Sequence, residues 1–177
     1  MKILSLPLNL KKEEANLVIR FSKHKGNSLT KLEALYDFMN KLYGFIKQYT
    51  PCKKSCSHCC YYEISLSEVE IQFIERSLKI KRSKNEYLGD FYGVPCPFLK
   101  NQVCSIYFHR PFVCRRHVIL HNSSTYCHVD VANKHETLLP RFSEVDKVYE
   151  MIILQENQSD IIDIKEILFD IRKIFSK

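Results

Sequence analysis

The chain has 177 residues, 45% of them hydrophobic, and a formal net charge of +7. This length fits one domain of ordinary size, whose apolar fraction is sufficient for a core without disulfide staples. No apolar stretch approaches the roughly eighteen residues of a membrane span, and the first ten residues lack the cleavage site of a signal peptide. The 27 Lys and Arg residues form no long basic run, so nucleic acid is not expected as a partner. We expect a cytoplasmic protein.

The first part of the chain is expected to be helical. A modest helix is predicted over residues 11–25, and a Gly-Asn pair ends it. Thr30 and Glu33 have the spacing of a capping box, in which a hydroxyl and a carboxylate accept from the first free amides of a helix. Apolar residues then recur every three or four positions, as an amphipathic helix requires: Leu32, Leu35, Tyr36, Met39, Leu42, Tyr43 and Ile46. Pro51 ends this helix, because the residue before a proline disfavours helical geometry.

A second capping box follows in the middle of the chain. Residues 61–66 are expected to be extended. Ser67 and Glu70 have the capping-box spacing and predict a helix that reaches about residue 80. Charged and polar residues at 81–86 then indicate an exposed loop.

Short elements are expected over the next sixty residues. Extended segments at 94–99 and 103–107, separated by a polar turn, predict a small hairpin. Pro111 favours a helix start, so a short helix is predicted over 112–117. The periodicity is poor over 118–139, which indicates a loop with at most one helical turn.

Two helices are predicted to end the chain, one over 143–156 and one from Ser159 or Asp160 to about 175. The prediction for the whole chain, 1–177, is a single mostly α domain. Its helical parts, 11–50 and 143–175, would flank a loop-and-short-hairpin segment at 52–127.

That middle segment contains all eight cysteines of the chain, and four of them lie within nine positions. Eight cysteines in a protein expected to be cytoplasmic suggest metal or redox chemistry rather than disulfides. Thiolates are soft donors, and tetrahedral sets of four bind zinc or iron–sulfur clusters. All eight are candidate metal ligands: Cys52, Cys56, Cys59, Cys60, Cys96, Cys104, Cys114 and Cys127.

The sequence leaves the division of these ligands open. Adjacent side chains diverge in most backbone conformations, so Cys59 and Cys60 would either serve two neighbouring centres or include one structural residue. Eight thiols make two four-thiolate sites, or one cluster plus spare cysteines, of which Cys127 is the first candidate for a buried structural role. The histidines of the region are further candidates: His58, His117, His121 and His128.

Three arginines lie close to Cys114 in sequence, namely Arg110, Arg115 and Arg116. A zinc ion with four thiolates carries a net charge of about −2, which nearby guanidinium groups can offset. Alternatively, these arginines form ordinary salt bridges or are exposed charges, and the sequence favours neither interpretation.

The order of these motifs resembles the YkgJ-type cysteine-cluster proteins, described as zinc- or iron-chelating. The resemblance covers about residues 52–116 and rests on Cys-x3-Cys-x2-Cys-Cys followed by Cys-Pro-Phe-Leu, Cys-Ser-Ile-Tyr and Arg-Pro-x2-Cys-Arg. The matching residues are Cys52, Cys56, Cys59, Cys60, Cys96, Cys104, Tyr107, Arg110, Pro111, Cys114 and Arg115. The resemblance implies chelation of zinc or of an iron–sulfur cluster, with a [4Fe–4S] cluster the first choice if the metal is iron. A similar pattern occurs in longer enzymes that methylate flagellin lysines.

The sequence supports three functional hypotheses. The first is an accessory or structural metal-binding protein, and the second is an iron–sulfur redox or electron-transfer protein. The third is a radical enzyme using S-adenosylmethionine, because Cys52-x3-Cys56-x2-Cys59 has that family's spacing. A long helix before the motif and the lack of alternating strands and helices after it argue against the third. Whether the protein is an enzyme, and which protein partner it has, are not decided by the sequence.

Overall fold

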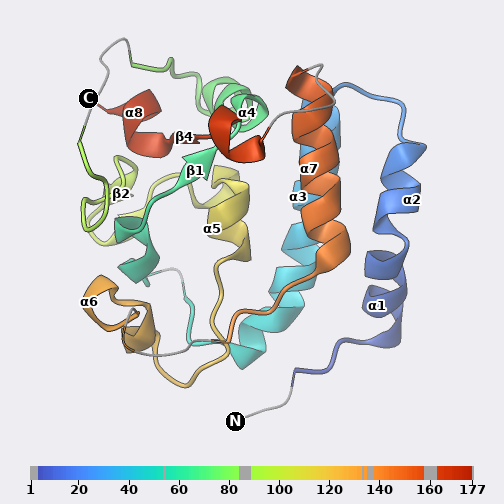
Figure 1. Ribbon diagram of the computed structural model, residues 1–177. Helices are drawn as coiled ribbons and strands as arrows, with labels where there is room; N and C mark the ends of the chain where they lie inside the picture. Colours follow the sequence, from blue (N-terminus) through green and yellow to red (C-terminus); the bar gives the residue numbers. More distant parts are fainter. Residues whose placement is uncertain are drawn as a thin grey trace.

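Helices from both ends of the chain form the frame of the molecule (Figure 1). The structure is a computed structural model that describes residues 4–53, 55–83, 89–132, 134, 138–157 and 163–176. Helices dominate these residues, so the predicted mostly α class is confirmed. None of the helices in these ranges has the length and apolar character needed to cross a bilayer.

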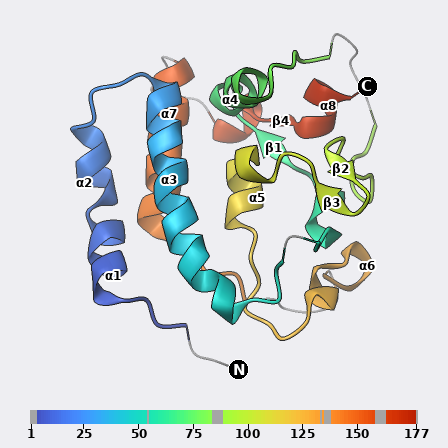
Figure 2. The ribbon, with the colours of Figure 1, turned by 180° about the vertical axis from the view of Figure 1, so that it is seen from behind.

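Helix α3 (Ser28–Ile46) is the central element of the frame. It packs against α7 (Ser143–Asn157), α4 (Glu68–Leu78) and α5 (Phe112–Arg116). Figure 2 shows α3 in front of α7, with the N-terminal helices on one side and the cysteine-rich part on the other. The apolar face predicted for α3 is buried throughout, from Leu32 to Ile46. The single-turn 3-10 helix η1 (Lys47–Tyr49) then leads into the cysteine segment.

The start of α3 differs from the prediction. The helix begins at Ser28, and the side-chain oxygen of Asn27 accepts a hydrogen bond from the amide of Thr30 at 3.0 Å. The predicted capping box at Thr30 and Glu33 is therefore wrong, because Asn27 is as good an N-cap as threonine and lies earlier in the chain.

The first helical segment begins and ends earlier than predicted, and it is divided. The predicted helix over 11–25 is replaced by α1 (Leu8–Ala15) and α2 (Leu17–Ser22), which pack against α7. The break falls at Asn16, whose side chain donates to the carbonyl of Lys12 at 2.8 Å. Side-chain bonds of this kind compete with the helical pattern.

Helix α4 confirms the second capping box and ties the frame together. Ser67 and Glu70 make both capping bonds, and the Glu70 side chain is completely buried. Its carboxylate also accepts from the hydroxyl of Tyr36 at 2.7 Å, from the amide of Phe112 at 2.7 Å and from the hydroxyl of Tyr149. One carboxylate thus joins α4 to α3, α5 and α7.

Replacing Glu70 with glutamine is expected to lower the free energy of unfolding by about 3 kcal/mol, because the new amide group must face hydrogen-bond donors that lose their acceptor. Urea denaturation followed by circular dichroism would measure this loss. Glu150→Gln on the exposed side of α7 is the matched control and should change stability by less than about 0.5 kcal/mol. Equal effects of the two changes would contradict the assigned role.

The predicted hairpin is present. Strand β2 (Leu99–Lys100) pairs with β3 (Val103–Cys104) in antiparallel register. The turn between them has positive φ at Asn101 (48°) and Gln102 (60°), as two-residue hairpin turns require. The single-turn helix η3 (Tyr107–His109) and then α5 follow it, and both α5 and α7 fall where the sequence predicts helices.

The end of the chain is not the continuous helix that the sequence predicts. Its described part contains η5 (Ile164–Ile167), strand β4 (Phe169–Asp170) and α8 (Ile171–Phe175), whereas the predicted start at 159 or 160 lies outside the described residues. The side chain of Asp163 accepts from the amide of Lys165, and that of Asp170 from the amide of Arg172. Each aspartate caps a new helix start, which divides the segment.

Strand β4 pairs with β1 (Ser65–Leu66), a contact that the sequence does not predict.

Two further predicted boundaries differ from the structure. Helix α4 ends at Leu78 because Lys79 adopts a left-handed conformation, and 118–139 holds two short helices, η4 (Ser124–Cys127) and α6 (Val129–Ala132). Of the predicted loop at 81–86, residues 84–86 lie outside the described ranges.

Candidate metal centre

The eight cysteines lie on five separate pieces of the chain. The segment after η1 carries Cys52 and Cys56, and the single-turn helix η2 (His58–Tyr61) carries Cys59 and Cys60. The hairpin region, α5 and η4 supply the remaining four: Cys96, Cys104, Cys114 and Cys127. None of the eight takes part in a disulfide.

Cys59 is the thiol around which the others gather. Its charge acts on Cys56 and Cys127 on one side and on Cys104 and Cys114 on the other. It also lines one cavity together with Cys52, Cys56 and Cys114. The fold thus brings thiols separated by up to 75 positions in sequence into electrostatic contact.

The contacts divide the other thiols into two groups. Cys127 interacts with Cys52 and Cys56, which forms the first group. The second consists of Cys96, Cys104 and Cys114. Cys60 interacts with Cys59 through its side chain, and its carbonyl accepts from the amide of Cys96 at 2.8 Å.

Within the described ranges, no three His, Cys, Asp or Glu side chains are already arranged to hold one metal ion. The structure therefore places the thiols together without assigning ligands to a particular ion.

Burial raises the pKa of several of these thiols. It raises the pKa of Cys96 from the usual 9.0 to about 11 and that of Cys127 to about 12. Burial also raises the pKa of Cys114, as do the charges of neighbouring thiols. For Cys59 the hydrogen bond with Cys60 is the first cause of a raised pKa, and burial adds to it. A thiol with a raised pKa is unfavourable as a bare thiolate, and zinc or an iron–sulfur cluster stabilises a set of such donors.

The metal-free protein is expected to lose stability as the pH rises from about 9 toward 11. A thiol whose pKa is raised by folding stabilises the folded state below its unfolded pKa, and this contribution is lost as the pH approaches the folded pKa. Cys96 and Cys127, with folded values of about 11 and about 12, account for the expected slope. Thermal melts of metal-free protein across this range would measure it. The Cys96→Ser and Cys127→Ser variants should each show a smaller slope, and an unchanged slope in both would contradict the assignment.

The three candidate arginines make different contacts, and one of the three acts on the thiols. Arg110 stacks its guanidinium on Tyr107 at 4.2 Å and lowers the pKa of Cys104 and Cys114 against the larger effect of burial. Arg116 forms a half-exposed ion pair with Asp146. Arg110 is thus the arginine whose charge acts on the thiols.

Arg115 stabilises the backbone around it through hydrogen bonds. Its buried guanidinium donates to the carbonyls of Arg110 at 2.8 Å and Phe108 at 2.6 Å and to Asn40 at 2.7 Å. It also lies over the ring of Tyr36 at 3.9 Å. These contacts fix the segment before α5 against α3.

The four candidate histidines occupy different surroundings. His117 lines the cavity beside Cys59 and Cys114, and burial lowers its pKa. His58 and His128 face each other with ring centroids 5.5 Å apart, and His128 also contacts Asp130. His121 packs on the ring of Tyr126.

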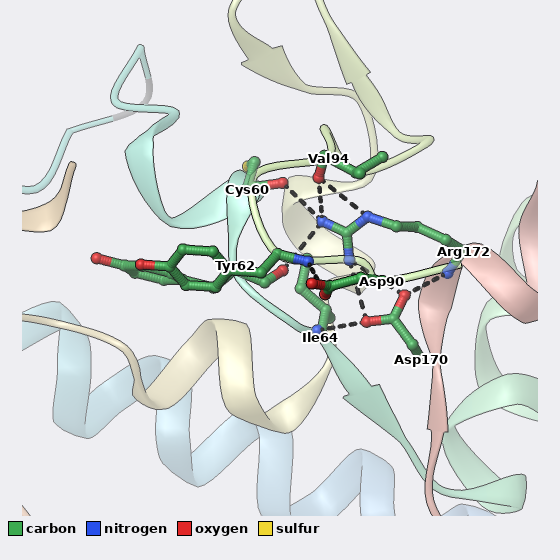
Figure 3. A network of polar contacts seen from close by, with 8 residues as sticks. Cys60, Tyr62, Ile64, Asp90, Val94, Asp170 and Arg172 are labelled. Carbon is green, nitrogen blue, oxygen red and sulfur yellow. Dashed lines mark hydrogen bonds and ion pairs between the residues drawn. The ribbon is translucent and has the colours of Figure 1, made fainter. Parts of the chain in front are cut away.

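A buried ion pair near the C-terminus holds the cysteine segments in place (Figure 3). Arg172 is 4% exposed and pairs with Asp170 at 3.0 Å. Its guanidinium also donates to the carbonyls of Cys60 at 3.2 Å, Tyr62 at 3.0 Å and Val94. The arginine therefore joins the chain at Cys59-Cys60 to the extended segment that carries Cys96.

Sequence reasoning missed this pair, which lies outside the cysteine segment. Asp170 also accepts from the amide of Ile64 at 2.9 Å, next to the pairing of β1 with β4. The available signal is local, since Asp170 has the residue type of an N-cap two positions before Arg172. That signal does not reveal contacts more than a hundred positions away.

Two further bonds connect the cysteine segments. The hydroxyl of Ser57 donates to Gln102 at the hairpin turn at 2.6 Å, and the hydroxyl of Tyr62 donates to the carbonyl of Cys127 at 2.7 Å. Together with the bond from Cys96 to Cys60, they connect η2 and the residues beside it to the hairpin region and to η4.

Comparison with protein families finds one match. Residues 51–135 match the CxxCxxCC family, which is described as a "Putative zinc- or iron-chelating domain". The match includes all eight cysteines and supports metal binding by this part of the chain. Comparison with the curated proteins and with the solved structures gave no significant match.

Proposed function

Because residues 51–135 match the CxxCxxCC family, we propose that the protein binds zinc or an iron–sulfur cluster through its clustered cysteines. The bound metal would stabilise a part of the fold that has few regular elements. The observation that carries the proposal is the gathering of five thiols, from five chain segments, around Cys59.

The grouping of the thiols supports two sites. Cys52, Cys56 and Cys127 would supply one, and Cys96, Cys104 and Cys114 the other. The adjacent pair of Cys59 and Cys60 lies between the groups, and one member would complete each set of four. Thiolate ligands neutralise a dication and leave net negative charge, which the nearby Arg110 offsets.

The protein's own residues hold such a group in three ways. They supply soft donors, they bury the donors away from water, and the pair of Arg172 and Asp170 fixes the backbone at the central cysteines. Reduced thiols are needed for binding, which agrees with a cytoplasmic location.

Metal analysis with an ultraviolet–visible spectrum, on protein purified without oxygen and without added metal, tests the proposal. Zinc at one or two ions per chain without visible absorbance would support the structural role. A brown protein with iron and acid-labile sulfide, bleached by dithionite, would support an iron–sulfur cluster with redox function. Protein that retains neither metal, and takes up neither on reconstitution, would refute the proposal.

A further inference from the structure

A cavity of about 420 Å³ lies beside the cysteines, between the C-terminal part of α3 and the residues before and after α5. Small-molecule sites occupy roughly 300–1,000 Å³, whereas the volume share of one water is about 30 Å³. The cavity is therefore larger than a metal ion needs and has the size of an organic ligand site.

The charged residues of its lining all carry the same sign: Lys47, Lys53, Arg110 and Arg115. No aspartate or glutamate is among the described lining residues. Four cysteines and a few uncharged polar side chains also line it, and the apolar part of the wall includes Met39, which is completely buried, and Phe108, which is 77% exposed. This combination favours an anion that has an apolar part.

Three residues that line this cavity each carry a buried polar atom with no hydrogen-bond partner. These atoms are the hydroxyl oxygen of Tyr43, Nε of Arg110 and Nε2 of His117, and His24 supplies the one other such atom among the described residues. Tyr43 is 6% exposed and sits on α3, while the other two lie on either side of α5. Buried polar groups are nearly always paired, and each unpaired one costs about 1–3 kcal/mol. Their concentration on residues that line one cavity favours a ligand there that pairs with them.

Metal-bound thiolates alone do not account for these groups. A negative centre at the cysteines would attract the guanidinium of Arg110, but it gives no reason for a cavity of this size or for the free hydroxyl of Tyr43 on the α3 side. A separate small anion would account for both the size of the cavity and the free hydroxyl of Tyr43.

We propose that this cavity binds a small organic carboxylate, with its carboxylate on Arg110, Tyr43 and His117 and its apolar part against Met39 and Phe108. The planar guanidinium fork matches the geometry of a carboxylate. The ligand would lie next to the proposed metal site, and the inference depends on the proposed function only for that neighbour, because the cavity itself is formed without metal.

A substitution at Gly44 can obstruct the cavity without removing a core side chain. It lies inside α3 at the rim of the cavity, and a Cβ added there would meet nothing within 4 Å. Glycine inside a helix costs about 0.5–1 kcal/mol relative to alanine. Gly44→Ala should therefore stabilise the protein and leave the cavity open, whereas Gly44→Phe should obstruct it.

The test uses ligand-observed NMR and calorimetric titration of phenylacetate and hexanoate against their neutral amides, on metal-loaded and metal-free protein. The acids are expected to bind at least about tenfold more tightly than the amides. Arg110→Gln should weaken the acids by about tenfold or more and Tyr43→Phe by several-fold, whereas the exposed Arg76→Gln should leave their affinity unchanged. Gly44→Phe should abolish binding, and Gly44→Ala should retain it.

Four results would overturn the inference: no detectable binding of either acid at about 10 mM, equal affinity for acids and amides, unchanged affinity in Arg110→Gln, or tighter binding of phenyl phosphate than of phenylacetate. Metal content is measured on every sample. A wild-type protein that holds metal but binds no acid refutes only this inference, and one that binds acid but never metal refutes only the proposed function.

Discussion

Replacing Arg172 with methionine is expected to lower the free energy of unfolding by about 3–5 kcal/mol, because it leaves a buried carboxylate without its cation. Asp170 would lose its partner at 3.0 Å, and the carbonyls of Cys60, Tyr62 and Val94 would lose their donor. Urea denaturation followed by circular dichroism would measure the loss in metal-free protein. We also expect weaker metal binding, because the backbone at the central cysteines would no longer be fixed to the segment of Cys96.

Lys173→Met is the matched control, since this lysine is exposed on the same short helix and should change stability by less than about 0.5 kcal/mol. Asp170→Asn combined with Arg172→Met should recover part of the loss, because an uncharged side chain is less costly to bury than an unpaired carboxylate. A single Arg172→Met variant that loses less than about 1 kcal/mol would show that the pair does not support the cysteine segments.

The parts of the fold that follow from local chemistry were predictable from the sequence. The capping box of Ser67 and Glu70 and the apolar repeat of α3 are signals contained within a few turns of chain, and both are confirmed. The predicted start of α3 was wrong because the sequence offers two N-cap residues. Asn27 lies before Thr30, and the helix begins after Asn27. The prediction of one continuous C-terminal helix was also wrong because of an N-cap. Asp170 caps a new helix start, which the apolar spacing alone does not reveal.

The candidate site divides along the same line. Cysteine spacing singles out the eight thiols as candidate ligands, because thiols are rare and their chemistry is specific, and their role as ligands stays a prediction. The residues that hold them were not predictable, since Arg172 lies 112 positions from Cys60 and a lone arginine near a chain end carries no signal of burial. Tyr43 was read as an ordinary core residue from its place in the apolar repeat. Only the structure shows that its hydroxyl is buried and unpaired and that the residue lines the cavity beside the cysteines.

Replacing Cys59 with serine is expected to remove at least half of the bound metal and to destabilise the metal-loaded protein by several kcal/mol, because metal binding is coupled to folding in such segments. Cys59 interacts with both thiol groups, so its loss should disturb both sites, and a serine hydroxyl is a hard donor that does not replace a thiolate. Metal content per chain and thermal stability, each with and without chelator, would measure the two effects. In metal-free protein the substitution should cost much less, because it removes no packing volume larger than a sulfur atom.

Ser57→Ala is the control in the same segment. It removes the bond to Gln102 and should cost about 1 kcal/mol, yet it removes no thiol and should leave the metal content unchanged. Cys60→Ser and Cys127→Ser then separate ligands from structural cysteines, since only a ligand lowers the metal content. If all three cysteine variants keep the full metal content and the wild-type response to chelator, the thiols around Cys59 do not hold the metal, and the electrostatic contacts among them reflect only their common burial.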